Sequence, residues 1–215
     1  MGLTNLAGVY IQTLRIDDGL RMAQEALDYF QQGNHPRLAF LCLTHIGRGF
    51  RRKGDYSAAQ HALNQKLDLA KQSQSQAAIA DTHVELGALL MEQEQLPGAL
   101  EHYDKAIELY GSTNPFLVAF CNVNRAQILA RLGRYEEARG LLAELSKSTA
   151  KTVGALLPDV YLAQAEMSLT ERNWQQAISS GNEALKAGGP TSSISIQTQY
   201  VLAVAKAGSG ARSDA

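Results

Sequence analysis

The feature that most constrains this chain is an internal repeat of 39 or 40 residues that occurs five times within 215 residues. In each copy, a large apolar residue is followed three positions later by a small one. The large residues are Ile16, Tyr56, Leu96, Tyr135 and Trp174, and the small ones are Gly19, Ala59, Ala99, Ala138 and Ala177. Self-similarity at a fixed period is typical of repeat architectures, in which each unit buries its apolar face against the next.

A second column of small residues lies twelve positions before the first: Ala7, Gly47, Gly87, Ala126 and Ala165. Within each half unit, apolar residues recur at i, i+3, i+4 and i+7, which is the period of an amphipathic helix. Small residues at fixed places in paired helices allow their backbones to approach closely. Each unit is therefore predicted to be a helix, a short turn and a second helix.

Polar connectors separate the units, and Pro36, Pro115, Pro158 and Pro190 fall just before the next first helix. Proline suits the first turn of a helix and stops the one before it. The predicted repeats span about 1–34, 37–73, 77–111, 116–149 and 158–188, with a cap helix at 192–206. We expect one solenoid domain over 1–205 and a flexible tail over 207–215. Because Ala7 lies so close to Met1, we also expect the natural protein to extend upstream.

These columns resemble the tetratricopeptide repeat (TPR) family over essentially residues 1–205, as do alanines late in the second helices, such as Ala26, Ala106 and Ala184. Lys66 and Leu145 replace that alanine in two units. The period exceeds the family's usual 34 residues and is similar to the extended repeats of LGN/Pins-like scaffolds and bacterial TPR regulators. The resemblance implies an all-α fold, a right-handed α-solenoid of five TPR-like helix-turn-helix repeats plus a C-terminal capping helix.

Composition excludes several classes of partner. The formal net charge is −1, which gives no general attraction to nucleic acid or to an anionic membrane. No apolar stretch approaches the roughly 18–20 residues that span a bilayer, and the first residues lack the features of a signal peptide. Cys42 and Cys121 form no disulfide framework and fit a reducing compartment. We therefore expect a cytoplasmic protein with no direct nucleic-acid or membrane partner.

The sequence shows no pattern of catalytic or metal-binding residues. The five histidines, at 35, 45, 61, 83 and 102, have no H-x-x-x-H or C-x-x-C partnership and are expected to be structural. Because no strand is predicted, neither a nucleophile elbow nor a glycine-rich phosphate loop has the preceding strand that it requires. Glu136 and Glu137 begin a second helix, where negative charge complements the helix dipole. The prediction is a non-enzymatic protein without cofactor or metal.

The resemblance also implies that the first helices line a concave groove in which extended peptides lie. The candidate groove residues are Thr44, His45, Arg48, Arg51, Arg52, Asp81, Glu85, Glu92, Asn124, Gln127, Arg131, Asp159 and Glu166. On one hypothesis, a basic end around Arg48 and Arg52 holds a peptide's carboxylates, and Asn124 fixes its backbone amides. On the other, the same two arginines simply pair with Glu85 and Glu92 of the adjacent first helix.

The leading functional prediction is a protein–protein interaction scaffold that binds a peptide or protein segment in the groove, as part of a larger protein. The alternative is a ligand- or peptide-sensing regulatory domain that controls an attached DNA-binding or signalling output domain. The family's carboxylate clamp for chaperone tails is not expected, because only Asn5 and Asn124 match its asparagine. Self-association through the exposed ends of the solenoid is a further expectation.

Overall fold

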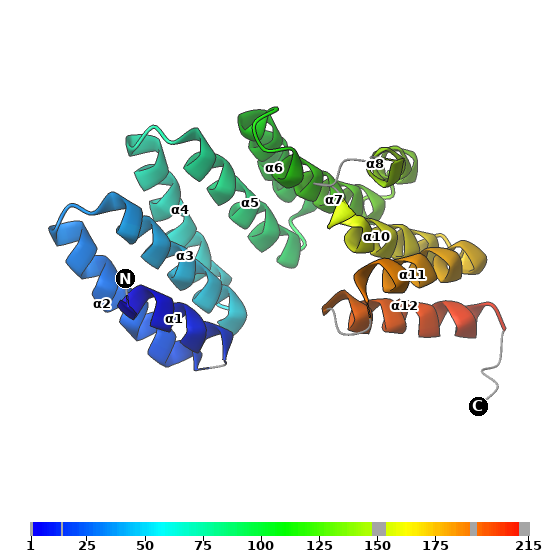
Figure 1. Ribbon diagram of the computed structural model, residues 1–215, viewed down its shortest axis with the longest axis horizontal. Helices are drawn as coiled ribbons and strands as arrows, with labels where there is room; N and C mark the ends of the chain where they lie inside the picture. The colour runs from blue at the N-terminus through cyan, green and yellow to red at the C-terminus, as the bar shows by residue number, and fades with distance from the viewer. Residues whose placement is uncertain (1, 14, 148–153, 190–192, 211–215) are drawn as a thin grey trace. The chain divides into compact units, whose positions relative to one another are not determined.

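The computed structural model describes residues 2–13, 15–147, 154–189 and 193–210, and these residues form eleven α-helices and no strand (Figure 1). The helices are α1 (Gly2–Gln12), α2 (Ile16–Gln32), α3 (Pro36–Lys53), α4 (Tyr56–Gln72), α5 (Gln76–Glu92), α6 (Leu96–Tyr110), α7 (Pro115–Arg131), α8 (Tyr135–Lys147), α10 (Leu157–Thr170), α11 (Trp174–Gly188) and α12 (Ser193–Gly208). The prediction of an all-α chain is confirmed for this part of the sequence.

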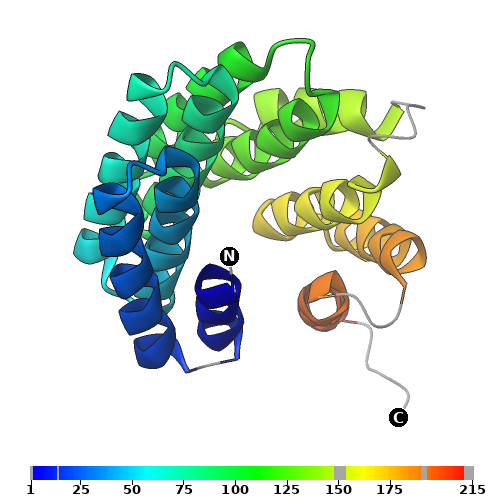
Figure 2. The same cartoon turned by 60° about the vertical axis from the view of Figure 1, so that its left-hand side comes forward.

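The helices divide into two compact units, Met1–Tyr110 and Gly111–Ala215. In the first unit, α1, α3 and α5 each pack against the helix that follows, which is α2, α4 or α6. In the second unit, α7 packs on α8 and α10 on α11, and α12 follows as a single helix against α11 (Figure 2). The sequence predicts one domain over 1–205, which stays a prediction, whereas contacts group α1–α6 and α7–α12 separately.

Within each unit, the first helices of successive repeats lie side by side. α1 contacts α3, α7 contacts α10, and α10 contacts α12. Among the described residues, no two second helices make contacts of comparable extent. These first helices therefore lie closer to one another than the second helices do, and α3 and α5 are joined by the Arg48–Glu85 and Arg51–Glu92 ion pairs.

The two small-residue columns form the contact between the helices of a pair. All ten of these positions are buried. Gly19 of α2 shows how close the approach is, because a Cβ atom added there would lie 2.8 Å from the carbonyl oxygen of Ala7 and 2.6 Å from Ile11 Cγ1. The column predicts the fold because any larger residue at such a place would push the two backbones apart.

The turns inside four of the repeats share a backbone feature that the residue pattern shows only in part. The residue two positions before the large apolar residue has a positive φ: 75° at Gly54, 60° at Glu94, 77° at Gly133 and 59° at Arg172. Glycine adopts this left-handed conformation without strain, whereas other residues pay for the clash of Cβ with the backbone. Glu94 and Arg172 therefore make their turns less stable than a glycine at the same positions would.

Arg172→Gly is expected to raise the free energy of unfolding by about 0.5–1 kcal/mol, because relief of the left-handed strain exceeds the added entropy of the unfolded chain. Gly54→Ala, at the equivalent turn, is expected to lower it by about 1 kcal/mol. Urea denaturation of both variants checks the pair. Destabilisation by Arg172→Gly would show that its side chain matters more than its backbone.

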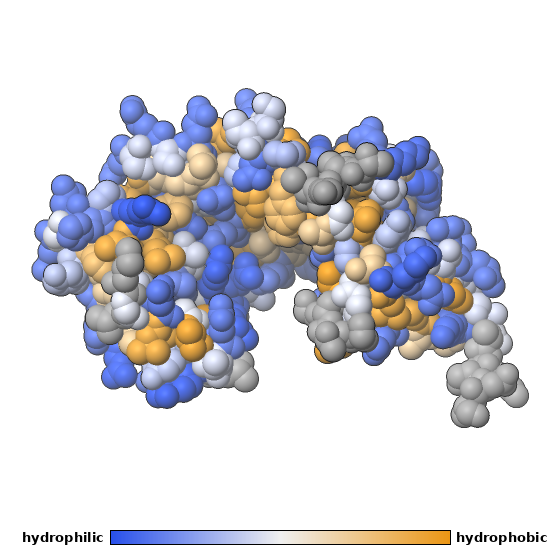
Figure 3. Space-filling model, in the orientation of Figure 1, coloured by the Kyte–Doolittle hydropathy of each residue, from blue (hydrophilic) through white to orange (hydrophobic). Residues whose placement is uncertain are grey.

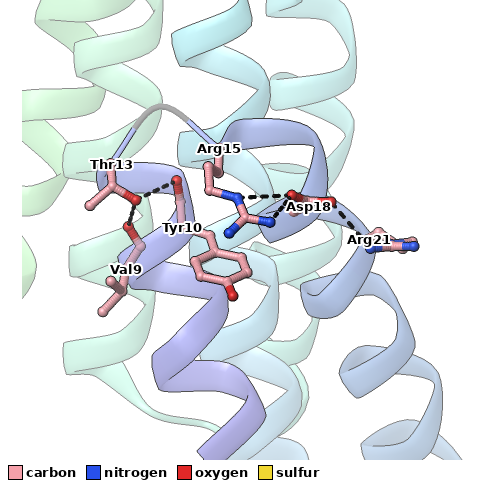
Figure 4. A network of polar contacts seen from close by, with 6 residues as sticks. All are labelled: Val9, Tyr10, Thr13, Arg15, Asp18 and Arg21. Carbon is pink, nitrogen blue, oxygen red and sulfur yellow. Dashed lines mark hydrogen bonds and ion pairs between the residues drawn. The ribbon is translucent and has the colours of Figure 1, made fainter.

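The first repeat closes its turn differently. The N-cap residue of α2, Arg15, makes no side-chain cap. Its guanidinium instead donates to Asp18 Oδ2 at 2.7 and 3.1 Å and lies 4.4 Å from the centre of the Tyr10 ring (Figure 4). Thr13 donates to the carbonyl of Val9 at the end of α1. The contacts of Arg15 with Asp18 of α2 and Tyr10 of α1 thus stand at the turn where Asp55 caps α4 in the second repeat.

Several predicted boundaries shift. Pro36 and Pro115 are the first residues of α3 and α7, and Pro158 is the second residue of α10, so these prolines lie inside the helices rather than before them. α12 runs to Gly208, so residues 207 and 208 are helical and the predicted tail begins too early. Gly208 packs against the Trp174 ring, which extends the helix. Three predicted features lie outside the described residues: Pro190, residues 148–153 of the connector before α10, and residues 211–215 of the tail.

Candidate functional site

The basic residues at the end of α3 all have partners within the first unit. Arg48 Nη2 lies 3.4 Å from Glu85 Oε1, and Arg51 Nε lies 3.4 Å from Glu92 Oε1. Arg52 donates to the main-chain oxygen of Gln12 at 3.4 Å. The structure therefore places Arg51, not Arg52, opposite Glu92. The reason is helical geometry. Arg51, three positions after Arg48, stays on the side of α3 that faces α5, whereas Arg52, one position further, is rotated toward α1.

The most deeply buried charge is Lys66, on α4, at the position where other repeats carry a late alanine. The residue is 1% exposed. Its ammonium lies 2.5 Å from Glu85 Oε2 and 4.4 Å from the centre of the Phe40 ring. Burial lowers the pKa of Lys66, and the attraction of Glu85 opposes that shift. Glu85 thus pairs with the buried Lys66 through one oxygen and with the exposed Arg48 through the other, which makes it the centre of the charged cluster on α3, α4 and α5.

Two predicted groove residues beside this centre are turned inward. Thr44 is buried, and its hydroxyl donates to the carbonyl of Phe40 within α3. His45 packs over Gly8 of α1, and its Nε2 is buried without a hydrogen-bond partner among the described residues. Burial, then the nearby Arg48, lowers the pKa of His45. A neutral imidazole and a satisfied hydroxyl therefore contribute packing to this face rather than charge.

On α5, the predicted residue Asp81 joins two helices of the third repeat. Tyr110 Oη, at the end of α6, donates to Asp81 Oδ1 at 2.5 Å. The Tyr110 side chain is buried, whereas Asp81 is exposed. A ligand at this carboxylate would have to share it with the tyrosine.

The second unit holds the remaining predicted residues, which are mostly amides and carboxylates. Gln127 of α7 donates to Glu166 Oε2 of α10 at 3.4 Å, and Asn124 Nδ2 donates to the carbonyl of Phe120 at 2.9 Å. Burial raises the pKa of Glu166, which the Gln127 donor partly offsets, and burial also raises the pKa of Asp159. Arg131 lies exposed at the end of α7. The predicted residues Asp159 and Glu166 are thus half-buried carboxylates on α10.

The third repeat also contains a histidine pair that the spacing of histidines in the sequence did not reveal. His83 Nδ1 of α5 and His102 Nδ1 of α6 lie 2.8 Å apart. One ring must donate and the other accept, so the contact cannot hold two fully protonated rings. Burial, then His102, lowers the pKa of His83 to about 4, and burial also lowers the pKa of His102.

Acidification is expected to destabilise the protein through this pair. The folded pKa of His83 lies below the unfolded value of 6.5, so the unfolded state binds more protons, and stability falls as pH drops from about 6.5 toward 4. We expect a loss of about 1–2 kcal/mol from this source. Urea denaturation from pH 7 to 4.5 should show a weaker pH dependence in His83→Gln than in the wild type. His61→Gln, at an exposed histidine, is the control and should behave as the wild type.

Other side-chain groups in the described residues bear on function less directly. No three or more His, Cys, Asp or Glu residues there lie close enough together to hold a metal ion. Cys42 and Cys121 are buried and form no disulfide among the described residues, and burial raises the pKa of Cys42 to about 11. A cavity of about 410 Å³ lies among α8, α10 and α11, where Arg139 spans both oxygens of Glu171 at 2.9 Å. None of the described helices is long and apolar enough to cross a membrane.

Sequence comparison decides the family. Two profiles of the tetratricopeptide repeat match residues 78–148 and 123–192, which together cover more than half of the chain. The chain is a tetratricopeptide repeat protein. The resemblance drawn from its repeat columns is therefore confirmed. No curated protein sequence matches this TPR chain.

Solved structures share the fold of this TPR protein at low identity. BtubC (BKLC) from P. vanneervenii has a TM-score of 0.69 at 15% identity, covering 91% of this chain and 85% of BtubC. The apo quorum sensor NprR from B. thuringiensis has a TM-score of 0.66 at 16% identity, covering 98% of this chain and 61% of NprR. A Rap protein complexed with Competence and Sporulation Factor has a TM-score of 0.69 at 15% identity, covering 98% of this chain and 64% of the Rap chain. The TPR chain thus spans less than two thirds of the NprR and Rap chains.

Proposed function

We propose that this TPR protein is a non-catalytic protein-interaction scaffold, and that the shared face of its first helices binds a peptide or protein segment. The observation that carries the proposal is the charged face of α3 and α5, where Arg48, Arg51, Glu85 and Glu92 meet. The hydrophobic core does not require Arg48, Arg51 or Glu92, whereas Glu85 also pairs with the buried Lys66. A Rap protein of the same fold is complexed with Competence and Sporulation Factor, which supports a binding role for the architecture.

The ion pairs on this face are compatible with binding. The side chain of Arg48 is 54% exposed, and those of Arg51 and Glu92 are 32% and 45% exposed. Exposed pairs of this kind contribute about 0–1 kcal/mol each. A partner's carboxylate or ammonium group can therefore replace one member at little cost, and the two hypotheses drawn from the sequence describe the free and the bound face.

Paired capture experiments test the proposal. The tagged wild type, a face variant with Arg48→Glu and Arg51→Glu, and an outer variant with Arg21→Glu and Lys105→Glu are used to capture proteins from lysate. The outer variant has the same change in charge, on the second helices α2 and α6, and it also breaks surface ion pairs. We expect proteins that the wild type and the outer variant retain and the face variant loses. Equal capture by all three folded proteins would contradict the assignment of the binding face.

The second candidate is a regulatory domain whose occupied face controls an attached output domain. It is favoured by the likeness to NprR, whose structure is described as that of a quorum sensor. A captured peptide that changes the scattering profile of the chain would support this role, and an unchanged profile would favour the scaffold. Self-association and a cytoplasmic location stay predictions; Ile196 and Tyr200 of α12, 76% and 70% exposed, are the apolar residues to replace in testing the former.

A further inference from the structure

A cavity of about 310 Å³ opens in the first unit where α3 begins, α4 ends and α5 begins. Its apolar wall consists of Pro36, Phe40, Leu69 and Ala78. The Phe40 ring is also held by the buried Lys66, whose ammonium lies 4.4 Å from the ring centre. Figure 3 shows apolar surface exposed between polar side chains over this unit. The volume is at the lower end of the range for sites that enclose a small ligand, about 300–1,000 Å³.

The mouth of the cavity carries positive charge that the protein does not neutralise. Arg37 lines it and is exposed, and its guanidinium makes no hydrogen bond or ion pair with any described residue. By contrast, each of the four basic residues at the other end of α3 has a partner within the unit. Ser75 caps α5 by accepting from the Ala78 amide, so the positive end of that helix also faces this region. No acidic residue is among the lining residues.

Helical spacing places lining residues of the cavity on the same sides of α3 and α5 as the proposed binding face. Arg37, Arg48 and Arg51 are spaced by eleven and three positions, which places them on one side of α3. Ala78 and Glu85, seven apart, share one side of α5 in the same way. Arg37 and Arg51 are fourteen positions apart, which corresponds to about 21 Å along the helix. Roughly six residues of an extended peptide cover that length.

We propose that this cavity takes a large apolar side chain of the bound partner, and that Arg37 binds a carboxylate next to that side chain. The recognised chemistry is an amphipathic anion, in which an aromatic or long aliphatic group lies a few bonds from the carboxylate. The inference deepens the proposed function and rests on it, because it names the chemistry of one part of the partner segment. It is tested without the partner.

The probes are N-acetyl-L-phenylalanine and its neutral amide, titrated into the uniformly 15N-labelled chain and followed by NMR. The acid is expected to shift the backbone amides around Ser75 and Ala78 and to bind about fivefold more tightly than the amide, because only the acid carries a charge for Arg37. Equal affinity for the two probes would overturn the role of Arg37.

Three variants complete the experiment. Arg37→Gln should lower the affinity for the acid to that for the amide, and Ala78→Trp should abolish binding of both by filling the cavity. Arg172→Gln, at an exposed arginine of the other unit without a partner among the described residues, should bind as the wild type. Unaltered binding to Arg37→Gln, or to folded Ala78→Trp, would overturn the proposal. If Ala78→Trp fails to fold, Arg37→Gln decides.

The outcomes separate this inference from the proposed function. Loss of probe binding in Arg37→Gln supports the cavity whatever the lysate experiment yields, because the probes are single small molecules. Absence of probe binding, together with capture that depends on Arg48 and Arg51, would rule out the cavity site and leave the proposed scaffold function supported.

Discussion

Glu85→Gln is expected to lower the free energy of unfolding by about 3–5 kcal/mol at neutral pH, because it leaves the Lys66 ammonium buried without a carboxylate. Lys66 is 1% exposed, and Glu85 lies 2.5 Å from it. A buried charge that loses its partner keeps the cost of leaving water while losing the attraction that offset it. Urea denaturation measures the loss.

The reverse substitution should be far milder. Lys66→Met keeps the length of the side chain and places an apolar group where other repeats carry alanine, so a change below about 1.5 kcal/mol is expected. In the double variant, Lys66→Met should recover most of what Glu85→Gln loses. Glu92→Gln, which breaks the exposed pair with Arg51, is the matched control and should cost no more than about 1 kcal/mol. Equal losses in the Glu85 and Lys66 variants would contradict the asymmetry.

The same account predicts a pH dependence for Glu85→Gln. Burial lowers the pKa of Lys66 below its ordinary value, and removing Glu85 removes the group that opposes this shift. The unfolded state of the variant then binds more protons than the folded state, so its stability should rise as pH increases from 7 toward 9. If the difference in unfolding free energy between Glu85→Gln and the wild type stays constant from pH 7 to 9, the charge on Lys66 does not cause the loss of stability.

Gly19→Ala is expected to lower the free energy of unfolding by about 2–3 kcal/mol, although alanine usually stabilises a helix. The added Cβ would lie 2.8 Å from the carbonyl oxygen of Ala7 and 2.6 Å from Ile11 Cγ1. Because the contact with the Ala7 oxygen involves the backbone of α1, rotation of the Ile11 side chain cannot relieve it, and the α1–α2 pair must separate.

Gly140→Ala is the matched control, because Gly140 also lies within a helix, α8, and a Cβ there would meet no atom within 4 Å. It should raise the free energy of unfolding by up to about 1 kcal/mol. Thermal denaturation of the two variants shows opposite shifts of Tm if the small column enforces close packing. Shifts of the same sign would contradict that interpretation.

The helical pairs of this TPR protein could be predicted because the small columns act through local spacing and recur in every repeat. Ala59 and Ala99, for example, are fully buried in equivalent places. What the sequence could not supply depends on the stacking of one helix against another. Lys66 reaches Glu85 across nineteen positions, and His83 meets His102 across the same separation, through helix contacts whose register no local pattern encodes.

The choice between Arg51 and Arg52 illustrates the same limit within a single helix. Both lie close to the side that faces α5, and a difference of one residue, about 100° of rotation, decides which one meets Glu92. One sequence signal was present and would have identified the centre of the site. A lysine at position 66, in a column of buried alanines, implies a buried charge, and a buried charge requires a partner.

The most direct test of the proposed binding face is hydrogen exchange of the chain with and without a partner obtained by capture. We predict slower exchange in peptides from the first helices, above all α3 and α5, and little change in the second helices α2, α4 and α6. Protection confined to the second helices would contradict the assignment of the binding face.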